Sequence, residues 1–419
     1  MLKKFYHLVT SSAYLTSILA LVSGTALAQL ITMGSMPILT RIYSPYEFSF
    51  LASVISISAI ASVAASLRYD IAIPLAENPR EQIDLSVIAL IFTTALSGAF
   101  LITISTLEFL LPTTISGQKD LFLLSIGLAV SMSYFNIFLS ISIKEKIFPI
   151  IARTKLIQAS AAALLQVALG WLTYTNYGLV IGYIFNYSTG CFLLAFILKN
   201  KFQKTNLTSL KNTAKKYSRF PKYSTLEALL NVFSIQIPIL LIATANIGAE
   251  AGYLILAMQV LQAPMALIGT AVGQAYYAYA TDKKNRSSLL LFTNKTTRNL
   301  LKISLIPSAF LFVFSPFLFK YIFGQPWVRA GELIQWMCPW FIAQFVTSPI
   351  SMALHVIGEQ KTAMLIQLLG VILRVFPTLI AISYATEYTA ETYALSGLFF
   401  YAIYYLITIK SLKKHANRT

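Results

Sequence analysis

Charged residues are scarce in this sequence: they make up 11% of its 419 residues. A soluble domain carries roughly 25%, so this shortage excludes a soluble protein of this length. The few charges lie in short clusters between apolar runs of about 20 residues or more, and such a run crosses a hydrocarbon core of roughly 30 Å as a helix. We therefore expect an all-α integral membrane protein of about twelve transmembrane helices.

Cysteine and histidine are also rare. The two cysteines, Cys191 and Cys338, fall inside apolar runs and lack the spacing of a disulfide framework or a metal site. The three histidines, His7, His355 and His415, are scattered along the chain. There is no HExxH motif, no glycine-rich phosphate loop with lysine and no Asp-x-Asp pair. The sequence therefore predicts no catalytic residue, no metal and no cofactor, and it indicates that the protein is not an enzyme.

Acidic residues number 15 against 32 lysines and arginines, which gives a net charge of +17. Such an excess in a soluble protein would point to nucleic acid. In a membrane protein the positive-inside rule explains it instead. If the N-terminus is inside, 27 basic residues fall in cytoplasmic segments, 4 fall outside and Arg374 lies within a span. We predict cytoplasmic N- and C-termini and no nucleic-acid partner.

The apolar runs define the expected spans. They lie near 15–39, 48–72, 85–111, 120–143, 153–174, 177–198, 223–244, 251–279, 297–322, 333–356, 362–385 and 391–411. A basic segment with eight lysines and arginines and no acid, 199–222, separates two sets of six. It has two interpretations: it attracts anionic head groups or a diphosphate, or it anchors the topology and links two lobes. The predicted domains are an N-terminal lobe (1–198), this cytoplasmic linker (199–222) and a C-terminal lobe with a short basic tail (223–419).

The two halves look related to each other. Pro37-Ile38-Leu39 is followed by Glu47 in the first half, and Pro238-Ile239-Leu240 is followed by Glu250 in the second. Because six spans is an even number, the repeat is parallel, with a pseudo-twofold axis along the membrane normal. Substrate sites in such proteins lie between the lobes. We expect two pseudo-symmetric six-helix lobes.

Several spans carry polar residues on one face at helical spacing. Such a face lines a polar path through the membrane or joins helices by hydrogen bonds, and the pattern alone leaves both interpretations open. The candidates for a substrate-binding cleft are Gln29, Asn231, Gln259, Gln262 and Gln367.

Arg374 is the one basic residue deep within a span, roughly 18 Å from its cytoplasmic end at 1.5 Å per residue. A buried arginine is expensive and is by default a functional candidate. No acid is predicted at its depth, so it suits a phosphate or a uronate, which it binds with two parallel hydrogen bonds. The alternative is an arginine that caps backbone carbonyls of a broken helix.

Four other charged residues lie near helix ends and are candidates for gating or for a latch between lobes. Arg68 and Asp70 either pair with a neighbouring helix tip or act as a gate, and Arg41 either forms a periplasmic latch or lies in a solvated loop. Glu227 is the only acid clearly inside a span, near its cytoplasmic end.

Short motifs along nearly the whole chain resemble bacterial oligosaccharide flippases of the Wzx type. In the first half they are Ser23-Gly24-Thr25-Ala26-Leu27-Ala28-Gln29, Pro37-Ile38-Leu39-Thr40-Arg41-Ile42-Tyr43-Ser44-Pro45, Glu47-Phe48, Leu67-Arg68-Tyr69-Asp70 and Ile73-Pro74. In the second half they are Arg219-Phe220-Pro221, Leu229-Leu230-Asn231, Gln262-Ala263-Pro264, Gly269, Phe323-Gly324, Trp327, Ala330-Gly331 and Ser348-Pro349.

This resemblance implies a fold shared with MATE-type multidrug exporters, with two six-helix lobes around a central cleft. It also implies that the protein passes an undecaprenyl-diphosphate-linked oligosaccharide, such as an O-antigen repeat unit, from the cytoplasmic to the periplasmic leaflet of a bacterial inner membrane. Membrane lipids and polysaccharide-assembly proteins are the further partners implied. Arg374 and Arg41 are the positions where it places contacts to the anionic head group.

Two other functions remain as alternatives. A cation-coupled multidrug exporter on the same fold predicts an acid deep in a lobe, whereas Glu227 is shallow. A membrane enzyme of polysaccharide assembly predicts a large periplasmic loop, and the sequence has none.

Overall fold

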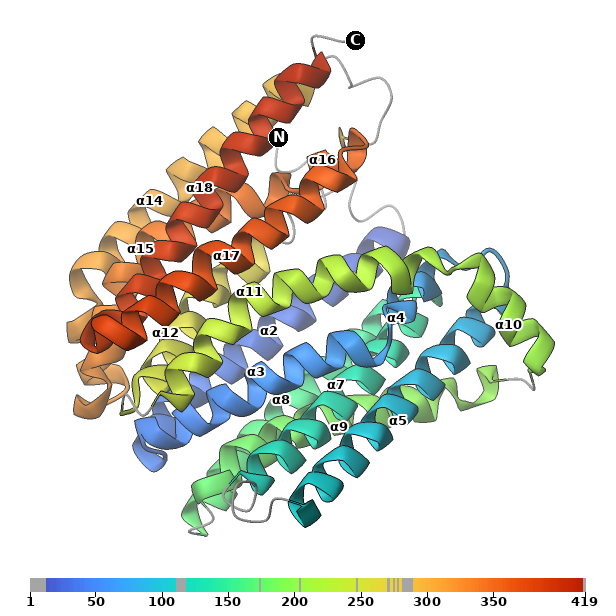
Figure 1. Cartoon of the computed structure of the whole chain (residues 1–419), viewed down its shortest axis with the longest axis horizontal. Coiled ribbons are helices and arrows are strands. Elements are labelled where there is room, and N and C mark those ends of the chain that lie inside the picture. Colours follow the sequence, from blue (N-terminus) through green and yellow to red (C-terminus); the bar gives the residue numbers. More distant parts are fainter. Residues whose placement is uncertain are drawn as a thin grey trace. The chain divides into compact units, whose positions relative to one another are not determined.

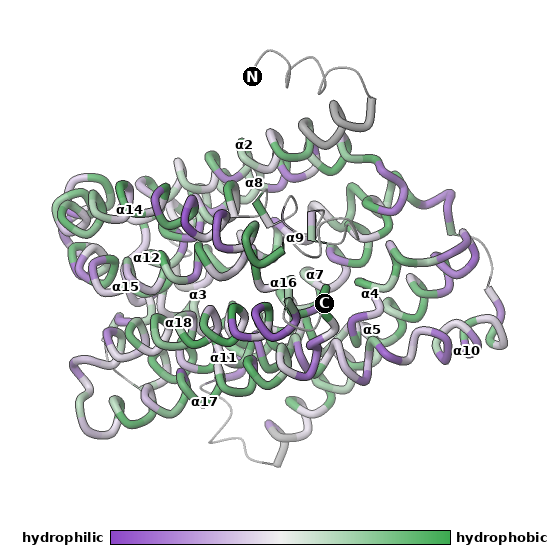
Figure 2. The backbone as a smooth tube through the Cα atoms, turned by 90° about the horizontal axis from the view of Figure 1, so that it is seen from above, coloured by the Kyte–Doolittle hydropathy of each residue, from purple (hydrophilic) through white to green (hydrophobic). Residues whose placement is uncertain are grey.

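The structure is a computed structural model. It describes residues 13–110, 118–172, 175–202, 205–245, 248–269, 272–273, 276, 279–280 and 289–416. Within these ranges the chain is helical and contains no strand, as the sequence predicts. Figure 2 shows hydrophobic residues along the long helices, with hydrophilic residues gathered in connections and helix ends.

Eleven helices in the described part of the chain are long and apolar enough to cross a membrane. They correspond to eleven of the twelve predicted spans, and the all-α membrane fold is confirmed. The remaining predicted span, 251–279, begins as helix α12 (Glu250–Pro264) and continues as a π turn (Met265–Gly269). Part of its second half lies outside the described residues.

Contacts between Cα atoms divide the chain into two compact units. Unit 1 comprises 1–43 and 54–229, and unit 2 comprises 44–53 and 230–419. One division, at 43/44, falls just before α3 (Pro45–Ala65). The other two fall inside the continuous helices α3 and α11 (Thr225–Thr244).

Unit 1 contains most of the first six spans, which Figure 1 shows in blue to green. Its other helices are α2 (Ala13–Ile42), α4 (Tyr69–Ala72), α5 (Pro79–Leu110), α7 (Lys119–Lys144), α8 (Phe148–Trp171), α9 (Thr175–Leu198) and α10 (Leu207–Lys216). Helix α8 packs against both α2 and α9. Gly24 allows the first of these contacts, because a Cβ there would lie 2.5 Å from the Cβ of Ala152. In the small-residue face of α3, Ser58 donates to the carbonyl of Ser125 and Ser62 accepts from Ser133, so these serines join helices.

Two glutamines bind α8 to α9 within the apolar part of unit 1. Gln158 Nε2 donates to the carbonyl oxygen of Asn186 at 3.0 Å, and Gln166 Nε2 donates to that of Leu179 at 3.1 Å. Gln158 lies against Gly190 of α9, and Gln166 lies against Gly182 of the same helix. A Cβ at either glycine would come 2.1 Å from the neighbouring glutamine side chain. These amides are therefore hydrogen bonded between helices, as polar groups in hydrocarbon must be.

The basic segment after α9 forms helix α10, which packs on α5. Asp84 on α5 is fully buried and accepts hydrogen bonds from Ser209 at 2.5 Å and Thr213 at 3.0 Å, both on α10. Lys216 Nζ pairs with Glu77 and Glu81, and these hydrogen bonds raise the pKa of Lys216. The segment is thus attached to unit 1 through polar contacts, while most of its lysines remain exposed.

Unit 2 contains the last spans, shown in yellow to red in Figure 1. Its helices besides α11 and α12 are α14 (Leu289–Ile322), α15 (Val328–Thr347), α16 (Met352–Val356), α17 (Gln360–Tyr384) and α18 (Thr389–Ala416). Helix α15 packs against α12, α14 and α18, and α18 packs also on α17. The first residues of α3 belong to this unit: Phe48 meets Trp327 edge to face at 4.8 Å between ring centroids.

Arg329 joins the N-terminal ends of three helices in unit 2. Its Nε donates to Glu250 on α12 at 3.0 Å, and its Nη2 donates to Glu391 on α18 at 2.6 Å. The side chains of Arg329, Glu250 and Glu391 are only 27%, 17% and 7% exposed. Glu332 adds a weaker contact at 3.4 Å and is 47% exposed. One cation therefore neutralises two largely buried carboxylates.

We predict that Arg329→Met destabilises the protein by about 3–5 kcal/mol, because it leaves the buried Glu250 and Glu391 without their cation. Thermal unfolding of the purified protein in detergent measures the effect. The matched control Glu332→Gln removes an exposed contact of the same arginine and changes stability by less than about 1 kcal/mol. Equal losses in the two variants would show that the contact to buried acids is not what stabilises this end of the unit.

Candidate functional site

Arg374, on α17, is fully buried in unit 2 and is surrounded by aromatic rings. Its guanidinium carbon lies 4.4 Å from the ring centroid of Phe400, 5.3 Å from that of Tyr401 and 5.4 Å from that of Trp340. These rings come from α18 and α15. Among the described residues no carboxylate forms an ion pair with Arg374. Cation–π contacts, each worth about 0.5–2 kcal/mol, therefore take the place of a counter-ion.

The guanidinium of Arg374 is under-satisfied. Nη1 donates to Ser234 Oγ of α11 at 3.3 Å, whereas Nε and Nη2 are buried without a hydrogen-bond partner. One turn earlier on α17, Gly370 allows Phe400 to approach, since a Cβ there would lie 2.7 Å from the Phe400 ring. We call Arg374 with Ser234, Trp340, Phe400 and Tyr401 the arginine cage. An anion reaches this arginine only after one of the rings moves.

The other predicted cleft residues of unit 2 lie on three helices. Gln367 is on the same side of α17 as Arg374, two turns earlier, half-buried and with Oε1 unpartnered. Asn231 is exposed on α11, one turn before the Ser234 that contacts Arg374. Gln259 is half-buried and Gln262 exposed on α12. The structure thus brings Asn231 and Gln367 to the helix faces near the arginine cage, and a cleft role for all five residues stays a prediction.

In unit 1 the predicted cleft residue Gln29 is half-buried on α2, one turn after Thr25. Thr25 Oγ1 accepts a hydrogen bond from Lys155 Nζ of α8 at 3.2 Å. Lys155 is half-buried, and none of the described carboxylates pairs with it. We call Lys155, Thr25 and Gln29 the lysine site.

Lys155 was missed as a site residue because the sequence places it among the cytoplasmic basic residues. The structure begins α8 at Phe148, so Lys155 lies two turns inside the helix, about 10 Å from its end. The signal that could have identified it is Phe148-Pro149, since proline favours the first turn of a helix.

Arg68, Asp70 and Glu227 come together in unit 1. Arg68 follows α3 with a left-handed backbone, φ 59°, and Leu67 before it also has a positive φ of 46°. Such conformations cost non-glycine residues about 1–3 kcal/mol each. Burial lowers the pKa of the Arg68 guanidinium, and the nearby Asp70 and Glu227 raise it. The strained turn therefore places Arg68 within electrostatic range of two acids, while gating by these residues stays a prediction.

Arg41, the remaining latch candidate, is exposed at the end of α2. Its Nη1 donates to the carbonyl oxygen of Pro37 at 2.7 Å, in the preceding turn. Glu47, near the start of α3, accepts hydrogen bonds from the backbone N–H and the hydroxyl of Ser44. A latch role for Arg41 stays a prediction. No group of three His, Cys, Asp or Glu residues in the described ranges is arranged to hold a metal ion.

Solved structures of similar fold are transporters. A mutant of the Vibrio cholerae MATE transporter VcmN aligns with a TM-score of 0.64 and 11% identity, over 96% of each chain. An inward-facing MATE family transporter of the MOP superfamily aligns with a TM-score of 0.62 and 15% identity, over 94% of this chain and 95% of the other. A MOP superfamily transporter from Pyrococcus furiosus gives 0.60 and 14%, over 94% and 96%. The MATE fold implied by the sequence is confirmed.

Comparison with curated proteins finds no match. A family model described as polysaccharide biosynthesis protein matches residues 38–332, which include α3 to α14 and the start of α15. As this match covers well over half of the sequence, the chain belongs to the polysaccharide biosynthesis protein family.

Proposed function

We propose that this protein is a flippase for an undecaprenyl-diphosphate-linked oligosaccharide, such as an O-antigen repeat unit. It moves this substrate from the cytoplasmic to the periplasmic leaflet of a bacterial inner membrane by alternating access. Polysaccharide-assembly proteins that make and use the repeat unit are its expected partners. The family supports polysaccharide assembly as the process, and the fold, shared with MATE transporters, supports transport as the role.

The observation that carries the proposal is the buried, unneutralised charge of Arg374. A charge without a counter-ion in a membrane-embedded helix is costly and is kept for a function. The two unpartnered guanidinium nitrogens, Nε and Nη2, suit a phosphate, which accepts two parallel hydrogen bonds from arginine. Lys155 of the lysine site, in unit 1, is a second cation inside a membrane-spanning helix. Among the described residues no acid forms an ion pair with it. Two such cations favour an anionic substrate.

Cation-coupled drug export, the alternative on this fold, would require an acid deep in a helix. Every described acid within a membrane-spanning helix lies within six residues of an end of that helix, and the buried Asp84 already accepts hydrogen bonds from α10. Binding-pocket polarity also differs between proteins of this fold: the Pyrococcus furiosus transporter is described as having a pocket of reverse polarity that suggests a different function. These observations favour the anionic carrier over a cationic drug.

Deletion of the gene in its own host tests the function directly. We expect loss of surface polysaccharide together with a cytoplasmic-leaflet build-up of the lipid-linked repeat unit, both reversed by the wild-type gene. The purified protein in vesicles should make a labelled lipid-linked oligosaccharide accessible to a lectin on the opposite side. Intact surface polysaccharide without any build-up of the intermediate would refute the proposal.

The variant Arg374→Met tests whether Arg374 serves substrate binding or the stability of the fold. Because the cage leaves two guanidinium nitrogens unpartnered, replacing the buried charge by an apolar side chain should leave thermal stability unchanged or increase it by up to about 4 kcal/mol. Transport in vesicles should fall at least about tenfold, the equivalent of one charge-assisted hydrogen bond. If the variant instead unfolds while its folded fraction transports normally, Arg374 is structural.

Lys155→Met should reduce transport by about tenfold or more for the same reason, and Lys155→Arg should retain part of the activity because it keeps the charge. The control is Arg153→Gln, which removes an exposed cation two residues away on α8 and should transport normally. Equal activity of Lys155→Met and Arg153→Gln would mean that Lys155 only anchors its helix at the membrane surface.

A further inference from the structure

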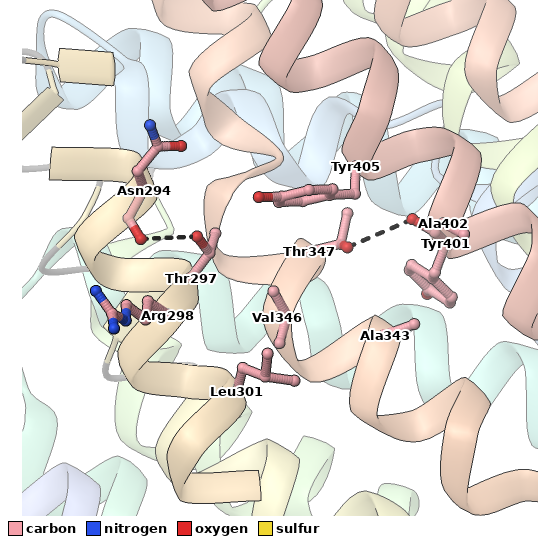
Figure 3. Close-up of a pocket in the computed structure, with 10 residues that line it drawn as sticks. All are labelled: Asn294, Thr297, Arg298, Leu301, Ala343, Val346, Thr347, Tyr401, Ala402 and Tyr405. Carbon is pink, nitrogen blue, oxygen red and sulfur yellow. Dashed lines mark hydrogen bonds between the residues drawn. The ribbon is translucent and has the colours of Figure 1, made fainter. Parts of the chain in front are cut away.

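Unit 2 contains a groove of about 480 Å³ between α14, α15 and α18. Its walls are formed by Leu301 and Arg298 of α14, Ala343, Val346 and Thr347 of α15, and Tyr401, Ala402 and Tyr405 of α18, with Asn294 and Thr297 at one end. In Figure 3 Leu301, Val346, Thr347 and Tyr405 gather toward the middle, while Arg298 and Asn294 extend from the outer side of α14. The lining is therefore mainly apolar, with one cation, Arg298, at its edge on α14. Its volume lies in the range of about 300–1,000 Å³ that small ligands occupy.

The charges around this groove are of one sign. Helix α14 carries Lys295, Arg298 and Lys302 in its first half and no acid along its whole length. Helix α18 ends with Lys410, Lys413 and Lys414, and its only acid is at the opposite end. Leu412 packs in one cluster with Leu289, which places the end of α18 beside the start of α14. No described acid pairs with any of these cations.

We propose that this groove binds an anionic phospholipid of the cytoplasmic leaflet, with its phosphate at Arg298 and part of one acyl chain on the apolar lining. Basic pockets between transmembrane helices on the cytoplasmic side bind anionic head groups, and the basic end of these helices is the end that the positive-inside rule places there. Below the groove α14 exposes Leu305 (49%) and Ile306 (80%), an apolar surface along which the chain can continue.

Tyr401 connects the groove to the arginine cage. Its backbone carbonyl accepts a hydrogen bond from Thr347 in the groove wall, at 3.4 Å, and its ring lies against the Arg374 guanidinium. A lipid in the groove therefore rests on a residue that covers Arg374.

The test uses the purified, delipidated full-length protein and follows lipid retention by native mass spectrometry. Phosphatidylglycerol and phosphatidylcholine with identical acyl chains are compared, and wild type should bind the first at least about tenfold more tightly. Arg298→Gln should lose this preference and Arg298→Lys should keep it, because the lysine preserves the charge. Ala343→Leu, which fills part of the apolar lining, should weaken both lipids. The matched control is Lys320→Gln, which removes an exposed cation at the other end of the same helix and should bind as wild type.

Two outcomes overturn the assignment. In the first, wild type binds the two phospholipids equally, or Arg298→Gln retains the preference; Arg298 is exposed, so this variant is expected to fold normally. In the second, undecaprenyl phosphate displaces phosphatidylglycerol from wild type at a tenfold lower concentration but not from Arg298→Gln, which would identify the carrier lipid as the occupant. The measurement involves no transport, so it stands or falls independently of the flippase function.

Discussion

The cost of an unneutralised charge in a medium of low dielectric constant is the constraint on which the rest of this structure depends. Arg329 and Arg374 show two responses to it within unit 2. Arg329 is held by Glu250 and Glu391 and joins the ends of three helices. Arg374 has three aromatic rings and one hydroxyl around it, and two of its nitrogens have no partner. The first arrangement pairs the cation with two carboxylates, although Glu391 Oε2 stays unpartnered, and the second leaves two donors of the cation itself unused.

The fold could be predicted from the sequence because membrane spans depend on one quantity, the length of apolar runs between charges. Most predicted spans therefore agree with the helices to within a few residues. The second helix, however, ends at Ala65 rather than at 72, before the turn at Leu67 and Arg68, and α14 begins at Leu289 rather than at 297. Hydropathy does not predict where a membrane-spanning helix is interrupted. The π turn at Phe220–Ser224 contains Pro221 and the π turn at Met265–Gly269 follows Pro264. Proline inside α14 and α17, in contrast, leaves those helices continuous. The result depends on whether neighbouring groups satisfy the freed carbonyls, which is tertiary information.

The candidate site was predictable in part. Arg374 stands out in the sequence because it is the only charge in the middle of a span. The structure buries it completely and gives its guanidinium one hydrogen-bond partner, Ser234. Glutamines are harder to interpret, because Gln158 and Gln166 join two helices whereas Gln262 is exposed, and all three look alike in an apolar run. Lys155 was counted with the cytoplasmic basic residues because the predicted span begins at 153, five residues after the helix begins at Phe148, and helix ends are the least certain part of any such prediction. The orientation of a side chain depends on the packing partner, which no single span reveals.

In the proposed function Arg374 binds a passing anion, and an aromatic cage is better suited to that role than an ion pair. Removing the partner of a buried ion pair costs about 3–5 kcal/mol, and a phosphate would have to supply that energy before any net binding. Exchanging cation–π contacts of about 0.5–2 kcal/mol each for hydrogen bonds to a phosphate costs less, and the phosphate also satisfies nitrogens that the closed cage leaves unpartnered. The closed cage thus lowers the cost of the buried charge without competing strongly with a substrate. The absence of an acid among its described neighbours is what makes Arg374 suitable for capturing an anion and releasing it again.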